Sequence, residues 1–314
     1  MAQLRPIGFG SVVFSNLAWG YQAFSQTHQK VYKKIAFIGG CIWRWRASAL
    51  WFGFLRNAQT PANMSTLVNI LKMPHRPFFD YRLSSMERIG LVISHHQLAA
   101  RLFCAELLEQ LQSGRRYGVA QIAGKSGATY QLCIGQGPLK EGVLSLSLMA
   151  DGKMAIYLAF TLVEASGRRK ALIGCVQASA NQPLETLRRL THEFHGIQPR
   201  LLLIHALRMI CKECEVQEIE AVSNENHAYM SPRYRRKITI QLAYDTLWEM
   251  VGGARRANRN FDIPLVASQK PLDLYPSRKR SEHRRRLSLR DDVRDQIVNN
   301  LDYQAQEAGS ILVA

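Results

Sequence analysis

The sequence predicts an α+β fold in which a mostly antiparallel, mixed sheet is flanked by helices. A series of short segments with the alternation of strands is joined by glycine-containing turns, which is typical of an antiparallel meander. The hydrophobic period then changes to that of helices before one more strand follows. A long helical crossover of this kind is expected to place that strand in parallel beside the last strand of the meander.

Residues 1–62 differ in composition from the rest and are predicted to form an N-terminal basic and aromatic extension. No apolar run reaches the roughly 20 residues that a membrane-spanning helix needs, because Arg44 and Arg46 interrupt the longest one. The segment 31–56 mixes Trp and Arg as interfacial helices do. Two interpretations are therefore open: a helix that lies on an anionic membrane, or a helix that packs its aromatic face on the domain.

The main domain is predicted to span residues 63–300, with a C-terminal tail at 301–314. A short helix over 66–73 should end before Pro74, and a long helix should cover 84–114. Turn pairs such as Asp151-Gly152 and Ser166-Gly167 then separate the strands of the meander. These strands are predicted at 118–123, 129–135, 143–149, 154–163 and 170–177.

The second half of the domain alternates between helix and strand. Pro183 and Pro199 are each suited to the first turn of a helix, and they predict a helix pair. Strands are predicted at 216–223 and 237–242. Asp245 is placed to cap a short helix that ends before Gly252 and Gly253.

The net charge restricts the partners of the chain, and the positions of two cysteines restrict their role. The 314 residues contain 41 Lys and Arg against 24 Asp and Glu, a formal net charge of +17, so the surface should attract polyanions. The basic clusters of the C-terminal third favour anionic lipid or lipopolysaccharide, and no specific nucleic acid is expected because no DNA- or RNA-binding motif accompanies them. Cys211 and Cys214 fall on an apolar helical stripe and are predicted to be core rather than a redox or zinc site.

Six sequence blocks, in this order, resemble those of the VirK/YbjX family of Gram-negative bacteria. The resemblance covers about residues 65–300 and implies a virulence-associated envelope factor that supports surface-protein display or resistance to cationic antimicrobial peptides. It also implies a location in the cytoplasm or peripheral to the inner membrane, and it indicates no reaction and no cofactor. The blocks are GVLSLSL (142–148), IGCVQ (173–177), LTHEFHGIQPRLLL (190–203), AVSNENH (221–227), AYDTLWEMVGG (243–253) and SRKRSEHRRR (277–286).

The order of elements also resembles that of GNAT-type acyltransferases, which makes an acyltransferase using an acyl donor one candidate activity. In that fold a glycine-containing turn after the last meander strand binds the pyrophosphate of the cofactor. Here the turn 177–182 reads QASANQ and has no glycine, and Cβ atoms hinder close approach of a phosphate. The resemblance implies Gln177, Ser179 and Asn181 as cofactor-binding residues, while a changed or lost cofactor is the alternative.

Three residues are candidate catalytic groups. His195 precedes Gly196 at a predicted helix C-terminus, where the helix dipole favours its cation. Tyr244 and Asp245 would supply an acid and a base. Each has a purely structural alternative, since His195 and Asp245 would equally serve as helix caps. The run H-E-x-H at 192–195 is one residue short of the zinc motif H-E-x-x-H, so no metal site is predicted.

Candidate substrate-binding residues follow the predicted central strand. Asn224 and His227 lie just after it, at the carboxyl end where α/β sheets commonly place ligands, and Arg236 belongs to a basic run that would attract an anionic substrate. A solvated loop without a binding role would contain the same polar residues. The second hypothesis for the whole chain is therefore a non-catalytic binding or chaperone-like factor in envelope biogenesis.

Overall fold

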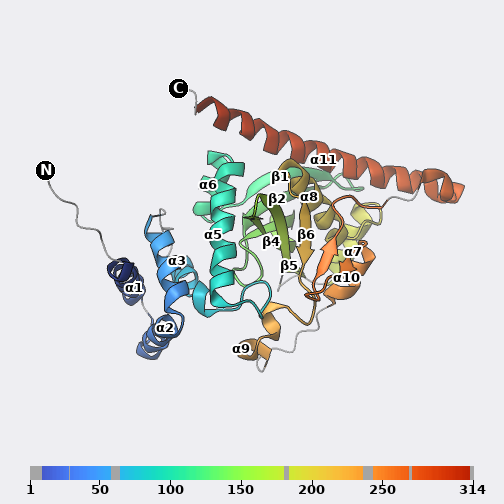
Figure 1. Cartoon of the computed structure of the whole chain (residues 1–314). Coiled ribbons are helices and arrows are strands. Elements are labelled where there is room, and N and C mark those ends of the chain that lie inside the picture. The colour runs from blue at the N-terminus through green and yellow to red at the C-terminus, as the bar shows by residue number, and fades with distance from the viewer. Residues whose placement is uncertain are drawn as a thin grey trace.

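A computed structural model shows a central sheet with helices on both of its faces (Figure 1). Helix α5 (Ser85–Leu102) covers one face, and α8 (Pro199–Glu213) covers the other. The α+β class predicted from the sequence is confirmed. The structure describes residues 9–27, 29–57, 64–179, 184–235, 243–268 and 271–311.

The meander and the parallel strand are also confirmed. The strands lie in the order β1-β2-β3-β4-β5-β6-β8-β7, antiparallel from β1 to β5 and parallel between β5 and β6. The predicted strand at 237–242 lies outside the described residues, whereas the short strands β7 and β8 were not predicted. The strands are β1 (Tyr117–Ala123), β2 (Thr129–Gln136), β3 (Leu144–Ala150), β4 (Lys153–Ala165), β5 (Arg168–Ala178), β6 (Glu218–Ala221), β7 (Ala254–Arg255) and β8 (Phe261–Ile263).

Strand β6 ends after a short region of pairing with β5, and this early end positions the candidate site. Residues 170–173 of β5 pair with 218–221 of β6, after which β6 ends while β5 continues to Ala178. The register between β4 and β5 shifts next to Ala159 and leaves Gly174 as an extra residue in β5. Such bulges bend a strand and re-aim the side chains that follow it. Here Cys175 and Gln177 follow.

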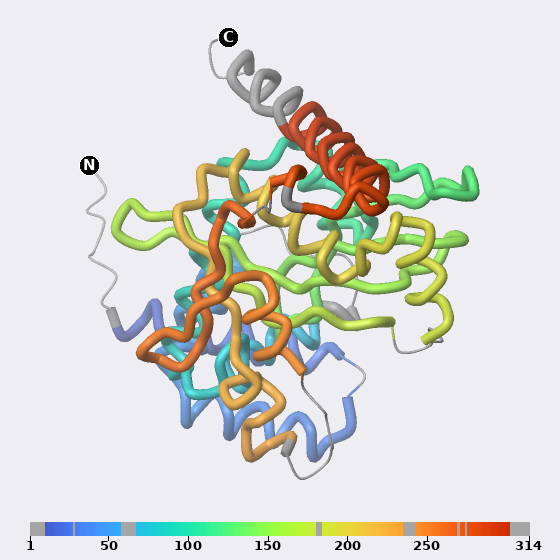
Figure 2. Tube along the Cα trace, turned by 90° about the vertical axis from the view of Figure 1, so that its right-hand side faces the viewer, coloured from blue at the N-terminus to red at the C-terminus, as the bar shows by residue number. Residues whose placement is uncertain are grey.

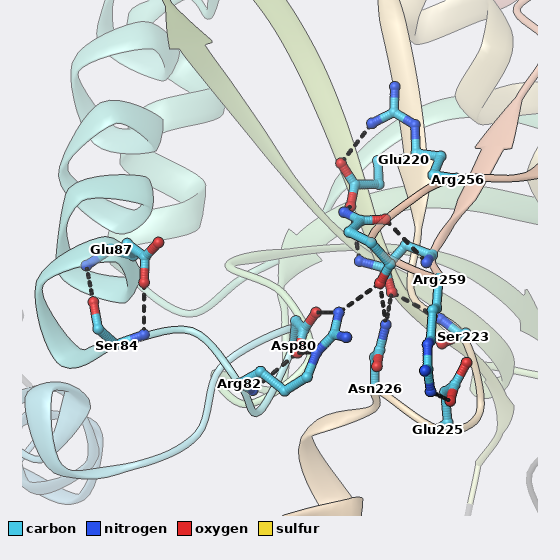
Figure 3. Close-up of polar contacts among 12 residues, drawn as sticks. Asp80, Arg82, Ser84, Glu87, Glu220, Ser223, Glu225, Asn226, Arg256 and Arg259 are labelled. Atoms are coloured by element: carbon cyan, nitrogen blue, oxygen red, sulfur yellow. Dashed lines mark hydrogen bonds and ion pairs between the residues drawn. The ribbon is translucent and has the colours of Figure 1, made fainter.

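The predicted long helix over 84–114 is wrong, because two helices occupy this segment. Helix α5 begins with a capping box, in which Ser84 and Glu87 each accept a backbone N–H from the other (Figure 3). It ends at Leu102 because Phe103 is extended and Cys104 Sγ accepts the N–H of Leu107, which starts α6 (Ala105–Gln112).

The N-terminal helices lie at one end of the molecule, beyond α5 (Figure 1). The side chains of Phe24, Phe37 and Trp51 are buried in one cluster with Phe78 and Ile89. Of the two interpretations of the segment 31–56, packing of an aromatic face on the domain therefore describes α3, whereas α2 buries Phe37 but exposes most of its other large apolar side chains. These helices are α1 (Phe9–Ser25), α2 (Val31–Trp43), α3 (Trp45–Asn57) and α4 (Met64–Leu71), followed by the 3₁₀ turn η1 (Met73–His75).

The remaining helices complete the two layers. Cys211 on α8 and Cys214 at its C-cap are buried, as predicted. Ala243 rather than Asp245 is the N-cap residue of α10 (Tyr244–Met250), so the capping prediction for Asp245 is wrong. Helix α11 (Ser277–Ile311) packs on α8 and β1 (Figure 2). Its bounds run through the boundary predicted at residue 300. The others are α7 (Leu184–Glu193), η2 (Ala228–Met230), α9 (Pro232–Arg235) and η3 (Leu272–Leu274).

Candidate functional site

Five polar side chains meet where β5 continues beyond the end of β6. They come from the β2–β3 loop, from β5, from the loop after β6 and from the first turn of α10. We refer to them as the Glu141 cluster: Glu141, Cys175, Gln177, His227 and Tyr244.

Glu141 lies at the centre of the cluster and is only 2% exposed. Gln177 Nε2 donates a hydrogen bond of 2.8 Å to its Oε1, and the Cys175 thiol lies 3.3 Å from its Oε2. His227 Nε2 is 3.4 Å from Oε1. A buried carboxylate needs such partners because its desolvation is costly.

His227 is completely buried, and its ring is only partly satisfied. Its Nδ1 accepts the backbone N–H of Tyr229 at 3.3 Å, so the neutral ring carries its proton on Nε2, which faces Glu141. Among the described residues Nε2 has no hydrogen bond of good geometry, and neither do the nearby hydroxyls of Ser223 and Ser231. Buried polar atoms are seldom left this way unless a ligand, a water or a reaction uses them.

Tyr244 is a proton donor without an acceptor among the described residues. Its hydroxyl accepts a 2.8 Å hydrogen bond from Gln177 Nε2, which leaves the phenolic proton available. Burial, then the neighbouring Cys175, raises the pKa of Tyr244 well above its usual value, so the phenol stays protonated. Burial and Glu141 likewise raise the pKa of Cys175, which makes this residue a thiol and not a thiolate nucleophile.

A single backbone segment holds the two halves of the Glu141 cluster together. Phe79 donates its N–H to the carbonyl of Lys140 at 2.8 Å, and Tyr81 donates to the carbonyl of Asn226 at 3.0 Å. Residues directly before Glu141 and His227 are thus tied to the same stretch of chain. Phe79 has a φ of 54°, an uncommon conformation for a bulky residue that is kept by these two attachments.

A buried polar network next to β6 fixes the loop that carries His227 (Figure 3). Asn226 Nδ2 donates to the carbonyl of Asn258 at 2.9 Å and to Oδ1 of Asn260 at 2.8 Å. Glu220 accepts from both of these asparagines and from Arg256 at 2.7 to 2.8 Å. Because every bond joins residues from different elements, the network orients the loop after β6 against β8.

Two of the predicted site residues, Asn224 and Asp245, bind each other. Asp245 Oδ1 accepts the N–H of Asn224 at 2.8 Å, and Asn224 Oδ1 accepts the N–H of Tyr244 at 2.9 Å. Asp245 also forms an ion pair with Arg255 at 2.7 Å. These contacts attach the start of α10 to the loop after β6 and so place the Tyr244 side chain.

Asp245→Asn is expected to lower the free energy of unfolding by less than about 1 kcal/mol, because the amide oxygen can still accept from Asn224 and the pair with Arg255 is partly exposed. Chemical denaturation of the two proteins measures this. If Asp245 is instead a catalytic base, the substitution will abolish activity while leaving stability almost unchanged.

His195 lies apart from the Glu141 cluster. It borders a pocket of about 490 Å³ between β1 and α11, and its carbonyl accepts a hydrogen bond of 2.6 Å from Arg286 Nε. Burial and the charge of Arg285 lower its pKa, against the stabilised cation expected from the helix dipole. Of the three candidate catalytic residues, Tyr244 and Asp245 therefore lie at or next to the Glu141 cluster, whereas His195 lies elsewhere.

The proposed cofactor and substrate residues are placed in part. Gln177 and His227 belong to the Glu141 cluster, and Ser179 lies at the end of β5, where its N–H donates to the carbonyl of Ala155. Asn181 and Arg236 lie outside the described residues. Across the described ranges, no group of three His, Cys, Asp or Glu side chains is arranged to hold a metal ion.

Sequence reasoning did not identify Glu141, Cys175 or Tyr157 as members of the site. Tyr157 on β4 donates its hydroxyl to Gln177 Oε1 at 3.3 Å. Glu141 lies in the segment PLKEG, which has the composition of a solvated turn. The one available indication was that Glu141 directly precedes the family-like block at 142–148.

Comparison with known proteins gives relatives of unknown function. The uncharacterized protein YbjX of Escherichia coli is 30% identical over 229 residues, which cover 71% of this chain and 69% of YbjX. An uncharacterized protein of Haemophilus influenzae is 25% identical over 218 residues, covering 69% of this chain and 72% of that protein. No helix among the described residues is long and apolar enough to cross a membrane.

Solved structures offer a weaker likeness. A variant of the cAMP-binding acyltransferase from Mycobacterium smegmatis matches with 11% identity and a TM-score of 0.29 over 75% of this chain, which spans 65% of that structure. The family model described as a protein of unknown function, DUF535, matches residues 26–299. By this match and by its similarity to YbjX, the chain belongs to the DUF535 family, in agreement with the VirK/YbjX resemblance of its sequence.

Proposed function

We propose that the chain is a transferase that moves an acyl group from a thioester donor to an amine or hydroxyl of a cell-envelope component. The observation that carries this proposal is the Glu141 cluster. It combines a buried carboxylate beside an imidazole with a protonated tyrosine whose proton has no acceptor among the described residues. An acid and a base at one place are what acyl transfer requires.

The reaction assigns a role to each group. The acceptor N–H or O–H loses its proton to the Glu141 carboxylate, beside which His227 Nε2 lies, as its nitrogen or oxygen forms a bond to the thioester carbonyl carbon. The carbon–sulfur bond then breaks, and Tyr244 gives its proton to the leaving thiolate. The proton taken from the acceptor then passes to Tyr244 and restores both groups, so the net products are an amide or ester and a thiol.

Access and charge favour an anionic reactant. Gln177 and the neighbouring Tyr157 and Tyr229 are half-buried, whereas the other four members of the Glu141 cluster are buried. The ammonium group of Lys140 lies over the rings of Tyr229 and Tyr234, at 5.1 and 4.5 Å from their centroids. A phosphate-bearing envelope lipid or lipopolysaccharide would meet the positive charge of Lys140 beside Tyr229 and the cluster.

The donor is best tested by titration calorimetry of the full chain against acyl-CoAs of several chain lengths and against acylated carrier proteins. The turn at 177–182 has no glycine to cradle a pyrophosphate, so carrier-bound donors are expected to bind more tightly than CoA esters. Absence of heat with every donor would rule out the acyl-transfer reaction.

A second candidate is a non-catalytic binding or chaperone-like factor that supports surface-protein display or resistance to cationic antimicrobial peptides. It is favoured by the complete burial of His227 and by the mutual pairing of Asn224 and Asp245, which leaves these groups occupied by the protein itself. Complementation of a deletion strain by Tyr244→Phe distinguishes the two. Full complementation supports the binding factor, whereas loss of complementation by a folded variant supports the enzyme.

A further inference from the structure

Helix α2 exposes its apolar side. Ile35, Ile42 and Trp43 are 63%, 71% and 82% exposed, and Val31, Tyr32 and Ile38 are exposed as well. At 3.6 residues per turn, these positions share an arc of roughly 140° that contains no charged residue. A surface helix of a water-soluble domain normally shows the reverse pattern, with its polar side outward.

The opposite side of α2 explains why the helix keeps this orientation. Phe37 is buried, stacks on Phe24 with ring centroids 4.0 Å apart, and lies 5.3 Å from the ring of His75. A side chain on Gly40 would approach the same histidine ring at 2.9 Å. The inner face is therefore already packed, and the outer apolar arc is a separate surface.

Positive charge surrounds this arc. Lys33 and Lys34 flank it on the helix, Lys30 precedes the helix, and Arg44 and Arg46 follow it. The first 79 residues of the chain contain no Asp or Glu, since the first acidic residue is Asp80. Each ion pair found among the described residues uses a cation from Arg82 onward.

The cations near α2 are close enough to affect one another. Burial and the charges of Arg44, Arg233, Arg76 and Lys72 together lower the pKa of His75 to about 4. Lys72 has its own pKa lowered by burial and by Arg76, Lys33 and Arg233. A surface that concentrates positive charge without acids is complementary to an anionic one.

We propose that α2 docks the protein on an anionic phospholipid bilayer, lying flat in the interface. The apolar arc would enter the boundary between headgroups and acyl chains, while the flanking lysines and arginines would reach the phosphates. Trp43 and Trp45 are residues of the kind that favour this interface, and Arg46 lies over the Trp45 ring at 5.2 Å. A 13-residue helix is about 20 Å long, suited to lying on a bilayer and too short to span it. This proposal is independent of the transferase.

Sedimentation of the full chain with vesicles tests the docking. Vesicles of phosphatidylcholine mixed with phosphatidylglycerol should bind at least about tenfold more tightly than vesicles of phosphatidylcholine alone, because each interfacial cation contributes about fivefold. The pair Ile35→Gln and Ile42→Gln should weaken binding by about 100-fold, because two apolar side chains no longer enter the bilayer. The matched control is Leu184→Gln with Val266→Gln, two positions that are 65% and 82% exposed elsewhere, and it should bind normally.

A second pair of variants distinguishes the effect of charges placed near α2 from the effect of the total net charge. Lys30→Gln, Lys33→Gln and Arg46→Gln together should weaken binding to the mixed vesicles by about 100-fold. Lys125→Gln, Lys153→Gln and Arg168→Gln remove the same net charge from exposed sites elsewhere and should have little effect. All variants change exposed side chains, so their thermal unfolding should match that of the parent protein.

Three results would overturn the proposal. One is equal loss of vesicle binding in both charge variants, which would mean that only net charge matters. Another is unchanged binding by the Ile35 and Ile42 variant. The third is a dimer in light scattering that this variant converts to a monomer, which would show that a second copy of the chain covers the apolar arc.

Discussion

Gly174→Ala is expected to lower the free energy of unfolding by about 3 kcal/mol and to displace Glu141. A Cβ atom at this position would lie 2.5 Å from the carbonyl carbon of Glu141 and 2.9 Å from its Cα, and it would also overlap the carbonyl oxygen. Because these are backbone atoms, no side-chain rotation can relieve the contact. The β2–β3 loop must move, and the carboxylate that organises the cluster moves with it. Chemical denaturation followed by circular dichroism measures the loss.

Gly90→Ala is the matched control for this substitution. Gly90 lies inside α5, and a Cβ atom there would meet nothing within 4 Å. The same change should therefore stabilise the protein by up to about 1 kcal/mol, as expected for Ala in place of Gly in a helix. Stability changes of the same sign and size in both variants would contradict a specific contact between Gly174 and Glu141.

The parts of the fold that were predictable depend on local chemistry. Asp151-Gly152 and Ser166-Gly167 have positive φ in all four residues and form the tight hairpin turns that their sequences indicate. The break between α5 and α6 was not predictable in the same way. It depends on Cys104 as an N-cap, a role that cysteine seldom fills. Strands β7 and β8, at two and three residues, are too short to show a hydrophobic period.

The candidate site was predictable where it follows the ends of elements. Gln177 ends a strand and His227 follows one, and each was identified for that reason, whereas Tyr244 was identified as a possible acid beside Asp245. The backbone of Glu141 lies against Gly174, the extra residue of the β5 bulge, and no local sequence pattern predicts this contact. The expectation for His195 considered its own helix alone, whereas Arg285, from α11 some 90 residues later, helps to lower its pKa.

Tyr244→Phe is expected to reduce the rate of acyl transfer by about 10²- to 10⁴-fold, the usual contribution of a positioned general acid. The phenolic oxygen accepts a bond from Gln177, while the proton that the reaction would use has no acceptor among the described residues. Donor binding should change little, because the ring and its packing on His227 and Trp248 are kept. Loss of the bond from Gln177 should cost only about 1 kcal/mol of stability. Single-turnover transfer and donor titration measure the two effects separately.

Tyr157→Phe is the matched control for Tyr244→Phe. Like Tyr244, Tyr157 is a phenol that contacts Gln177 and whose pKa is raised by burial, but it is half-buried and its hydroxyl proton is donated to Gln177 Oε1. If the cluster needs tyrosines only to hold Gln177, the two variants should lose similar amounts of activity. If Tyr244 is the proton donor, Tyr157→Phe should reduce the rate of acyl transfer by less than about tenfold, because this variant loses one hydrogen bond but keeps the proton-transfer step. The ratio of the two losses therefore separates a catalytic residue from a positioning one.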